Sequence, residues 1–317
     1  MPKFLVTGGA GFIGSNIVRE LVKRGEFVRV LDNFATGRPS NLEGIMDKIE
    51  FIQGDIRNLE LVKEAVKRID FVLHQAALPS VSRSVNDPIS TNETNITGTL
   101  NVLIASKDAK VKRVIYASSS SVYGNTLILP KKEDMTPNPQ SPYAITKYAG
   151  EQYCKVFHSI YGLETVILRY FNVFGPRQNP NSQYSAAIPL FIKAFLTETS
   201  PVIYGDGEQS RDFTFVENVV SANLLACCAE GVAGKVFNIA CGRRVSINDL
   251  VFTIRSWLNS DMEPTYKEAR KGDVQHSLAD ISKAQQFLKY EPKVNLEEGL
   301  KITIEWFKQE FNKQNGT

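Results

Sequence analysis

Short apolar runs alternate with helical stripes along the first half of the chain. The runs have the length and continuous hydrophobicity of strands buried on both faces of a parallel sheet. They lie at 4–7, 27–31, 49–53, 71–73, 114–116 and 165–168. Segments between them, such as 15–24, 59–66 and 89–106, repeat apolar residues three and four positions apart, as amphipathic helices do. The alternation predicts an α/β fold with a doubly wound parallel sheet of the Rossmann type.

The pattern changes after residue 175. Asn, Gln and Pro cluster through 178–183, which predicts a domain boundary. We expect residues 1–175 to bind a nucleotide and residues 176–317 to form a smaller mixed α/β domain that binds the substrate, with a segment at about 213–240 rejoining the first sheet. The elements expected after the boundary are helices at 186–197, 216–229, 246–258, 280–288 and 295–312 and strands at 202–204, 212–215 and 236–239.

A glycine-rich turn follows the first predicted strand. Gly8, Gly11 and Gly14 have a GxxGxxG spacing, and a predicted helix begins directly after them. Such a turn lets backbone amides approach a pyrophosphate, and the helix N-terminus adds partial positive charge there. The strand–turn–helix order therefore predicts a dinucleotide site.

Acidic residues end the next two predicted strands. Asp32 lies 18 residues beyond Gly14, near the spacing at which a carboxylate meets the adenosine ribose. A carboxylate there repels a 2′-phosphate, which favours NAD over NADP, although Arg38 nearby leaves the choice open. Asp55 could contact the adenine, or it could only stabilise the turn at the end of the strand.

Tyr143 and Lys147 are the candidates for proton transfer. The Ser-Pro pair before Tyr143 predicts a helix start, and two side chains four positions apart share one helix face. An ammonium nearby lowers the pKa of a phenol, which is ordinarily about 10. A tyrosine tuned in this way can take a proton from a sugar or alcohol hydroxyl while hydride leaves the same carbon. Alone, the pair would also fit an ordinary surface helix.

The hydroxyl-rich segment 118–121 supports the catalytic interpretation. Four serines follow the predicted strand at 114–116, at the carboxyl end where open α/β sheets bind ligands. A hydrophilic loop is the alternative, but loops seldom concentrate four serines between apolar segments.

Composition excludes several classes of protein. The 317 residues include 37 basic and 34 acidic ones without a basic run, so nucleic acid is not an implied partner. No apolar run reaches the length of a membrane span, and the N-terminus has no signal-peptide pattern. The four cysteines form no CxxC, and the three histidines have no metal-ligand spacing. We expect a cytoplasmic protein without a metal or a membrane partner.

Together these motifs resemble the extended short-chain dehydrogenase/reductases over essentially the whole chain. The resemblance rests on the glycine turn, the serine segment, the Tyr143/Lys147 pair and the Arg-Tyr-Phe-Asn-Val-Phe-Gly segment at 169–175. Within that group the chain is most similar to UDP-hexose 4-epimerases, especially those acting on UDP-N-acetylglucosamine and UDP-N-acetylgalactosamine. The implied reaction is 4-epimerisation of such a UDP-sugar through a 4-keto intermediate with tightly bound NAD, and UDP-glucose and UDP-galactose form a second substrate pair.

The resemblance also implies residue roles. Tyr143 is the base, Lys147 lowers its pKa and holds the nicotinamide ribose, and Ser119 hydrogen-bonds the sugar O4. The residues implied to bind NAD are Gly8, Gly11, Phe12, Ile13, Gly14, Asp32, Asn33, Thr36, Gly37, Asp55, Ile56, Gln75, Ala76, Ala77, Asn95, Ala117, Tyr143, Lys147 and Tyr170. Those implied to bind the UDP-sugar are Ser119, Asn172, Ala187, Ile188, Val202, Tyr204, Arg211, Arg270, Asp273 and Ser277. Asn172 and the two arginines are expected at the diphosphate, because guanidinium forks match phosphate oxygens, and Tyr204 near the uracil.

Departures from sister enzymes narrow the reaction. Related dehydratases carry an Asp-Glu pair just before Val-Tyr-Gly, and decarboxylases that make UDP-xylose carry a Glu in its second place. Ser120 and Ser121 stand there in this chain, and hydroxyls are poorly suited to acid–base chemistry at C5 and C6. Ser277 stands where epimerases restricted to UDP-glucose and UDP-galactose have a bulky Tyr, which leaves room for an N-acetyl group.

Two other functions remain as alternatives. The protein could be a net C4 oxidoreductase of a UDP-amino sugar that releases a changed cofactor, or a cofactor-bound scaffold that has lost catalysis. The resemblance further implies a homodimer, with the helices at 89–106 and 142–161 forming a four-helix bundle between subunits.

Overall fold

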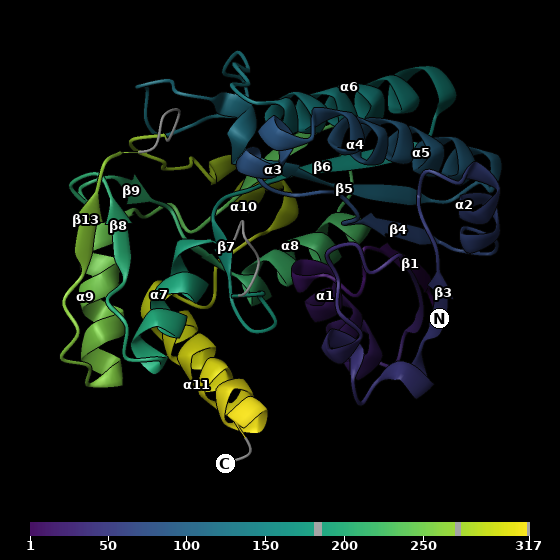
Figure 1. Ribbon diagram of the computed structural model, residues 1–317. Coiled ribbons are helices and arrows are strands. Elements are labelled where there is room, and N and C mark those ends of the chain that lie inside the picture. Colours follow the sequence, from purple (N-terminus) through teal and green to yellow (C-terminus); the bar gives the residue numbers. More distant parts are fainter. Residues whose placement is uncertain (181–185, 270–273, 316–317) are drawn as a thin grey trace.

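The computed structural model describes residues 1–180, 186–269 and 274–315. Within those ranges seven strands form one parallel sheet in the order β11-β6-β5-β4-β1-β2-β3. The strands are β1 (Lys3–Thr7), β2 (Phe27–Asp32), β3 (Glu50–Gln53), β4 (Phe71–His74), β5 (Arg113–Ser119), β6 (Glu164–Tyr170) and β11 (Val236–Ile239). The predicted doubly wound sheet is confirmed (Figure 1). The segment at 236–239 pairs with β6 as its last strand.

Helices cover both faces of the sheet (Figure 1). One face carries α2 (Leu59–Ala65), α3 (Val81–Asn86), α4 (Pro88–Asn92), α5 (Gly98–Asp108) and α6 (Pro142–Tyr161), and the other carries α1 (Phe12–Lys23), α8 (Val216–Cys228) and α10 (Ser282–Leu288). The helix predicted over 89–106 is a continuous stretch in which η3 (Glu93–Thr97) has π-helical hydrogen bonds. Short 3-10 turns are η1 (Pro39–Leu42), η2 (Met46–Lys48) and η4 (Ser120–Tyr123).

Alternate residues of the central strands supply two separate cores. In β1, Phe4 and Val6 pack with α1 and α8, whereas Leu5 packs with α2, α5 and α6. Successive side chains of a strand point to opposite faces, so a strand covered on both sides must be apolar throughout. This is why the strands appear in the sequence as continuous apolar runs.

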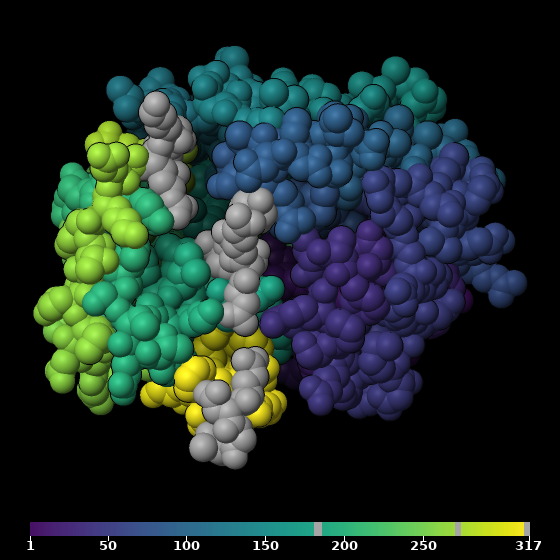
Figure 2. Space-filling view, in the orientation of Figure 1, coloured from purple at the N-terminus to yellow at the C-terminus, as the bar shows by residue number. Residues whose placement is uncertain are grey.

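A third core gathers the C-terminal helices. It is built by α7 (Ala187–Leu196), α9 (Ile247–Leu258) and α11 (Leu296–Asn315). Three small two-stranded sheets adjoin it: β7 (Val173–Phe174) with β10 (Thr214–Phe215), β8 (Val202–Tyr204) with β13 (Thr265–Lys267), and β9 (Ser210–Arg211) with β12 (Val245–Ser246). Figure 2 shows this region in green on the left and, for α11, in yellow at the bottom of the face in view, and the N-terminal residues in purple to the right.

The strand predicted at 212–215 is only partly confirmed. β10 covers its second half, Thr214–Phe215, whereas β9 ends at Arg211 and Asp212 lies between the two strands. The fully buried Asp212 carboxylate accepts the backbone amides of Cys241, Gly242 and Ala279 at 2.9, 3.0 and 3.2 Å. This position turns the side chain toward another loop and interrupts the strand.

None of the helices in the described ranges combines the length and apolar character that crossing a membrane requires.

Candidate active site

A cavity of about 490 Å³ runs along the carboxyl ends of the sheet strands from β3 to β5. This is the edge at which open α/β sheets bind ligands. All of the residues expected to hold NAD line the cavity except Gly37 and Asn95. Tyr143 and Lys147 are among the lining residues, so the cavity reaches from the glycine turn to the candidate catalytic pair.

The glycine turn is too tight for a side chain at Gly8 or Gly14. A Cβ on Gly14 would lie 2.1 Å from the Gly8 carbonyl oxygen, and one on Gly8, where φ is +70°, would lie 2.7 Å from the Ala76 amide nitrogen. Helix α1 starts at Phe12, with no side-chain cap in the described residues and no acidic residue in its first turn. Its first amides are therefore suited to an anion, and the turn fits the pyrophosphate of a dinucleotide.

Asp32 supplies negative charge beside this turn. Its carboxylate is 7% exposed and accepts the amides of Ala10 at 2.9 Å and Phe34 at 2.7 Å. Burial raises the pKa of Asp32, and the two amide hydrogen bonds act in the opposite direction. Arg38 lies outside the cavity lining, and its guanidinium donates to Asn41 Oδ1 and the Arg177 carbonyl, both at 3.3 Å. The 2′-phosphate of NADP would lie beside the Asp32 carboxylate, and Arg38 would not be there to neutralise it. The site therefore favours NAD.

Gly37 and Asn95, the two expected NAD residues outside the lining, contact segments that form the cavity wall. A Cβ on Gly37 would lie 2.8 Å from the Ala10 carbonyl carbon, so glycine lets this loop close on the turn. Asn95 accepts the amide of Leu78 at 2.8 Å and donates to the Leu78 carbonyl and Thr146 Oγ1, both at 3.1 Å. Because Leu78 lines the cavity, Asn95 fixes one wall against α6.

Helix α6 positions the catalytic candidates as the sequence suggests. Ser141 caps it by accepting the Ala144 amide at 3.1 Å, and Pro142 is its first residue. Lys147 is 5% exposed, and its Nζ donates to the Ala117 carbonyl at 2.8 Å and lies 6.0 Å from the centroid of the Tyr143 ring. The carboxyl end of β5 and one face of α6 thus meet at the end of the cavity.

The electrostatics of this pair differ from the sequence-based expectation. Burial raises the pKa of Tyr143, and a hydrogen bond with Ser119 acts in the lowering direction. Burial also lowers the pKa of Lys147 to about 8, against the effects of Cys154 and Glu151. The expected lowering of the Tyr143 pKa by Lys147 is not seen, because removal from water disfavours both charged forms.

The expected substrate residues lie beyond the cavity lining. Arg211 donates to the carbonyls of Ser210 at 3.0 Å and Gln275 at 3.2 Å, and the Ser277 amide donates to the Ser210 carbonyl at 2.9 Å. Asn172 Nδ2 donates to the Asp212 carbonyl at 3.0 Å. The structure therefore brings Arg211, Asn172 and the 7% exposed Ser277 to one short segment around β9.

The other expected substrate residues are more scattered. Val202 and Tyr204 belong to β8, and Ala187 begins α7. The Ile188 side chain is 1% exposed in the third core, so a contact between this residue and a ligand would have to involve its backbone. Arg270 and Asp273 lie outside the described residues.

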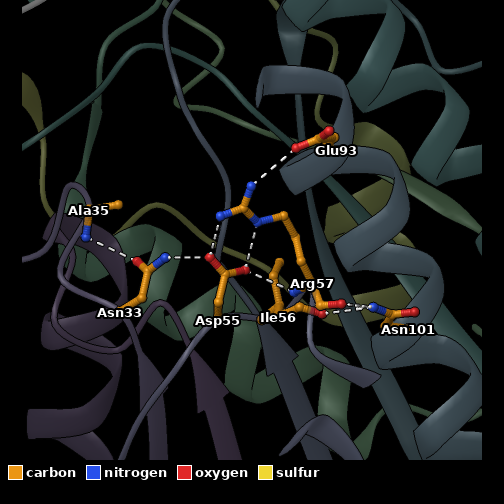
Figure 3. Close-up of polar contacts among 7 residues, drawn as sticks. All are labelled: Asn33, Ala35, Asp55, Ile56, Arg57, Glu93 and Asn101. Atoms are coloured by element: carbon orange, nitrogen blue, oxygen red, sulfur yellow. Dashed lines mark hydrogen bonds and ion pairs between the residues drawn. The ribbon is translucent and has the colours of Figure 1, made fainter. Parts of the chain in front are cut away.

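Sequence reasoning missed several groups at the site. Arg57, Arg83 and Asp87 also line the cavity, together with Ser118 of the serine segment that was expected there. Figure 3 shows the Arg57 guanidinium between Asp55 and Glu93, to which it donates hydrogen bonds. Glu151, behind Ser118, forms a buried ion pair with Arg169 on β6, 2.7 Å apart. The one available signal was the spacing of Glu151, which stands four residues after Lys147 on the same face of α6. Within the described ranges no cluster of three or more His, Cys, Asp or Glu side chains could hold a metal ion.

Comparisons with known proteins agree with this geometry. The family described as NAD dependent epimerase/dehydratase matches residues 4–240. A putative UDP-glucose 4-epimerase of Methanocaldococcus jannaschii is 39% identical over 306 residues, 96% of this chain and 98% of its own. A UDP-N-acetylglucosamine 4-epimerase structure from Methanobrevibacter ruminantium, in complex with UDP-N-acetylmuramic acid, is 43% identical with a TM-score of 0.93, covering 98% of this chain and 99% of that one.

A UDP-glucose 4-epimerase structure with UDP-glucose from Thermotoga maritima is 40% identical with a TM-score of 0.94, again covering 98% and 99% of the two chains. The family match includes both the glycine turn and the Tyr143/Lys147 pair, and the relatives cover nearly the whole chain. The chain therefore belongs to the NAD-dependent epimerase/dehydratase family, as its resemblance to the extended short-chain dehydrogenase/reductases predicted.

Proposed function

We propose that the chain is an NAD-dependent UDP-sugar 4-epimerase that prefers UDP-N-acetylglucosamine and UDP-N-acetylgalactosamine and accepts UDP-glucose and UDP-galactose as a second pair. The main support is the position of Tyr143 and Lys147 at one end of a cavity that begins at the glycine turn. Tyr143 is also hydrogen-bonded to Ser119. Relatives named as UDP-glucose and UDP-N-acetylglucosamine 4-epimerases support this reaction.

Different residues of the cavity would bind different parts of NAD. The glycine turn and the start of α1 would hold the pyrophosphate, Asp32 the adenosine ribose, and Lys147 the nicotinamide ribose. Bound NAD would supply a hydride acceptor and donor at C4 of the sugar and, when oxidised, a positive charge that favours the phenolate. We assign residues 1–175 with the segment at about 213–240 to this cofactor domain, and the rest of 176–317 to UDP-sugar binding.

Tyr143 is the proton carrier in this mechanism. Its phenolate takes the proton of the sugar 4-hydroxyl as that carbon is oxidised, and its phenol returns a proton when the 4-ketose, turned over in the pocket, is reduced on its other face. Ser119 hydrogen-bonds the sugar O4 and Tyr143 together. Arg211 holds the diphosphate, so the UDP stays anchored while the sugar moves.

The Lys147 charge gives this mechanism a pH limit. Its pKa of about 8 means that the ammonium is present below that pH and is lost above it. We expect kcat/KM for UDP-N-acetylglucosamine to fall as the pH rises through about 8, measured as an initial-rate pH profile. A level profile from about pH 7 to about pH 10 would exclude a titrating Lys147.

Ser277 is the proposed opening for the N-acetyl group. Its amide is held on the Ser210 carbonyl beside Arg211, near the expected diphosphate site. We expect Ser277→Tyr to lower kcat/KM for UDP-N-acetylglucosamine on the order of 10²-fold and to leave UDP-glucose within about threefold, because a bulky ring fills the space beside C2. The matched control is Ser277→Ala, which removes only the hydroxyl and should change neither value. Equal losses for both sugars with Tyr at this position would refute the assignment.

The experiment that tests the function follows the anomeric proton by NMR. Purified protein is incubated with UDP-N-acetylglucosamine and, separately, with UDP-glucose, and the 4-epimer with an axial hydroxyl is sought. A 4-epimer from both sugars, formed faster from the acetylated one, is the expected result. Stoichiometric NADH release without a 4-epimer would instead indicate a net C4 oxidoreductase.

We also propose a homodimer through α5 and α6. Ile145, Val156 and Ile160 on α6 are 52%, 41% and 69% exposed and follow one stripe of the helix. An apolar stripe of this kind is suited to pairing with a second copy. Light scattering of the purified protein should give the mass of two chains, and Ile160→Glu should shift it toward one. A monomeric wild type would contradict the proposal.

A further inference from the structure

Asp212 carries a buried carboxyl group between β9 and β10, and no role was expected for it. Its side chain is 0% exposed, and its partners in the described ranges are backbone amides. A carboxylate without a cation beside it is costly to remove from water. Burial accordingly raises the pKa of Asp212 to about 6, and the amide hydrogen bonds act in the lowering direction. The position of these amides indicates what the carboxylate does.

The amides belong to two segments that are far from β9 in the sequence. Cys241 and Gly242, in the loop after β11, donate to the two Asp212 carboxylate oxygens at 2.9 and 3.0 Å. Ala279, in the segment that leads to α10, donates at 3.2 Å. Asp212 is therefore the point at which the end of β9, the loop 240–243 and the segment 276–280 are joined.

The joined segments carry residues that are expected at the UDP-sugar. Arg211 directly precedes Asp212, and Asn172 donates from its side-chain amide to the Asp212 carbonyl at 3.0 Å. Ser277 belongs to the segment before α10, and its amide donates to the Ser210 carbonyl of β9 at 2.9 Å. None of these five residues lines the NAD cavity. A change at Asp212 should therefore reach the substrate end of the site and not the cofactor end.

We propose that Asp212 is a positioning residue of the UDP-sugar site, whose carboxylate holds the segments 240–243 and 276–280 against β9 and so sets the affinity for the UDP-sugar. The inference rests on the proposed function, because it takes Arg211 and Ser277 as substrate contacts. An ionised carboxylate suits this task because both of its oxygens accept hydrogen bonds and neither donates. A side-chain amide of the same shape would turn an NH₂ group toward at least one of the donating amides. Asp212→Asn therefore weakens the joint without changing its size.

The charge of Asp212 gives the inference a second readout. As the pH falls through about 6, the carboxyl group gains a proton, which then faces backbone amides that cannot accept it. The joint is therefore intact above about pH 6 and weakened below it. We expect the affinity for the UDP-sugar to fall over the same range.

Cys241 and Tyr290 are the titratable side chains that act on the Asp212 carboxylate. Burial raises the pKa of Cys241 to about 12 and that of Tyr290 well above its usual value, so neither changes charge near pH 6. Arg211 and Arg243, on the adjoining segments, stay protonated throughout. His276 also lies on the segment before α10, with its Nδ1 2.9 Å from the Ser210 hydroxyl oxygen, and is separated from Asp212 by a variant of its own.

The test measures the dissociation constant of UDP-N-acetylglucosamine by calorimetry on the full chain with NAD bound. The diphosphate of this ligand is esterified at both ends, so it does not titrate near pH 6. Asp212→Asn should raise the dissociation constant about 10- to 30-fold at about pH 8 and leave the NAD content per chain unchanged. It should also remove the fall in affinity that the wild type shows between about pH 7 and about pH 5.

Two further variants serve as controls. Asp280→Asn makes the same substitution on the same segment, but that carboxylate accepts the Ser282 amide at 2.8 Å and does not contact Asp212. It should keep the dissociation constant within about twofold of the wild type. His276→Gln should keep the pH dependence.

An unchanged dissociation constant in Asp212→Asn would overturn the inference, and so would a matching loss of NAD, because the whole fold would then be disturbed. Should that variant fail to fold, the wild type decides: a level affinity from about pH 7 to about pH 5 would overturn the inference. A pH dependence that persists in Asp212→Asn and disappears in His276→Gln would refute the role of the Asp212 charge. A wild type that binds the UDP-sugar without epimerising it would refute the proposed function alone, and one that does not bind it would refute both.

Discussion

We expect Tyr143→Phe to lower kcat for the proposed epimerisation of UDP-N-acetylglucosamine by about 10³-fold or more and to leave NAD bound. The substitution removes only the hydroxyl that carries the proton, and general acid–base catalysis supplies about 10²- to 10⁴-fold. The ring stays in the buried site beside Ser119 and Lys147, so the cavity keeps its shape. The measurement is the NMR rate of 4-epimer formation together with the NAD content per chain.

A second tyrosine of the same helix provides the control. Tyr153 on α6 packs against the α2–α5–α6 core and does not line the cavity. Tyr153→Phe should keep kcat within about twofold, since a peripheral hydroxyl contributes little. If Tyr143→Phe keeps more than about a tenth of the wild-type rate with NAD bound, another group carries the proton and the mechanism is wrong.

The sheet was predictable because its strands have no solvent face. Every central strand is buried on both sides, so burial alone imposes continuous apolar runs, and the glycine turn is imposed by contacts such as Gly14 against Gly8. These constraints act over a few neighbouring residues, and a single sequence displays them. The alternation predicts a parallel sheet but not the order of its strands, which only the structure shows.

The contacts between distant segments could not be predicted in the same way. Ser210 hydrogen-bonds His276, which is 66 residues away in the sequence, and its carbonyl accepts the amide of the adjacent Ser277. Asp212 likewise accepts amides from two other loops. The Arg57–Glu93 pair similarly joins elements 36 residues apart. Nothing local in the sequence marks these partners. The raised pKa of Tyr143 was missed for a related reason, because burial is a property of the whole fold.

Glu151 links α6 to the sheet in a buried ion pair. The fully buried carboxylate accepts Arg169 Nε at 2.8 Å, Arg169 Nη2 at 2.7 Å and Ser118 Oγ at 2.5 Å. The Arg169 guanidinium carbon also lies 4.6 Å from the centroid of the Tyr123 ring. Ser118 lines the cavity next to Ser119, so the pair fixes α6, β5 and β6 at the point where proton transfer is proposed.

Substituting Glu151 by Gln should lower the free energy of unfolding by about 3–5 kcal/mol, measured by urea denaturation, because it leaves Arg169 buried without its counter-charge. The double substitution Glu151→Met with Arg169→Met should recover most of that loss, since apolar residues of similar size can replace a whole buried pair.

A purely structural role for Glu151 would end with its effect on stability, but its charge also acts on Lys147, which we propose to be catalytic. Glu151 raises the pKa of Lys147 against burial, so both the single and the double variant should move the basic limb of the kcat/KM profile below the value of about 8 expected for the wild type. The double variant is decisive because it separates the effect on stability from the effect on Lys147. Restored stability together with a shifted basic limb of the pH profile would show that Glu151 positions Lys147 and keeps it protonated. Restored stability with an unshifted limb would leave the pair a structural link between α6 and the sheet and nothing more.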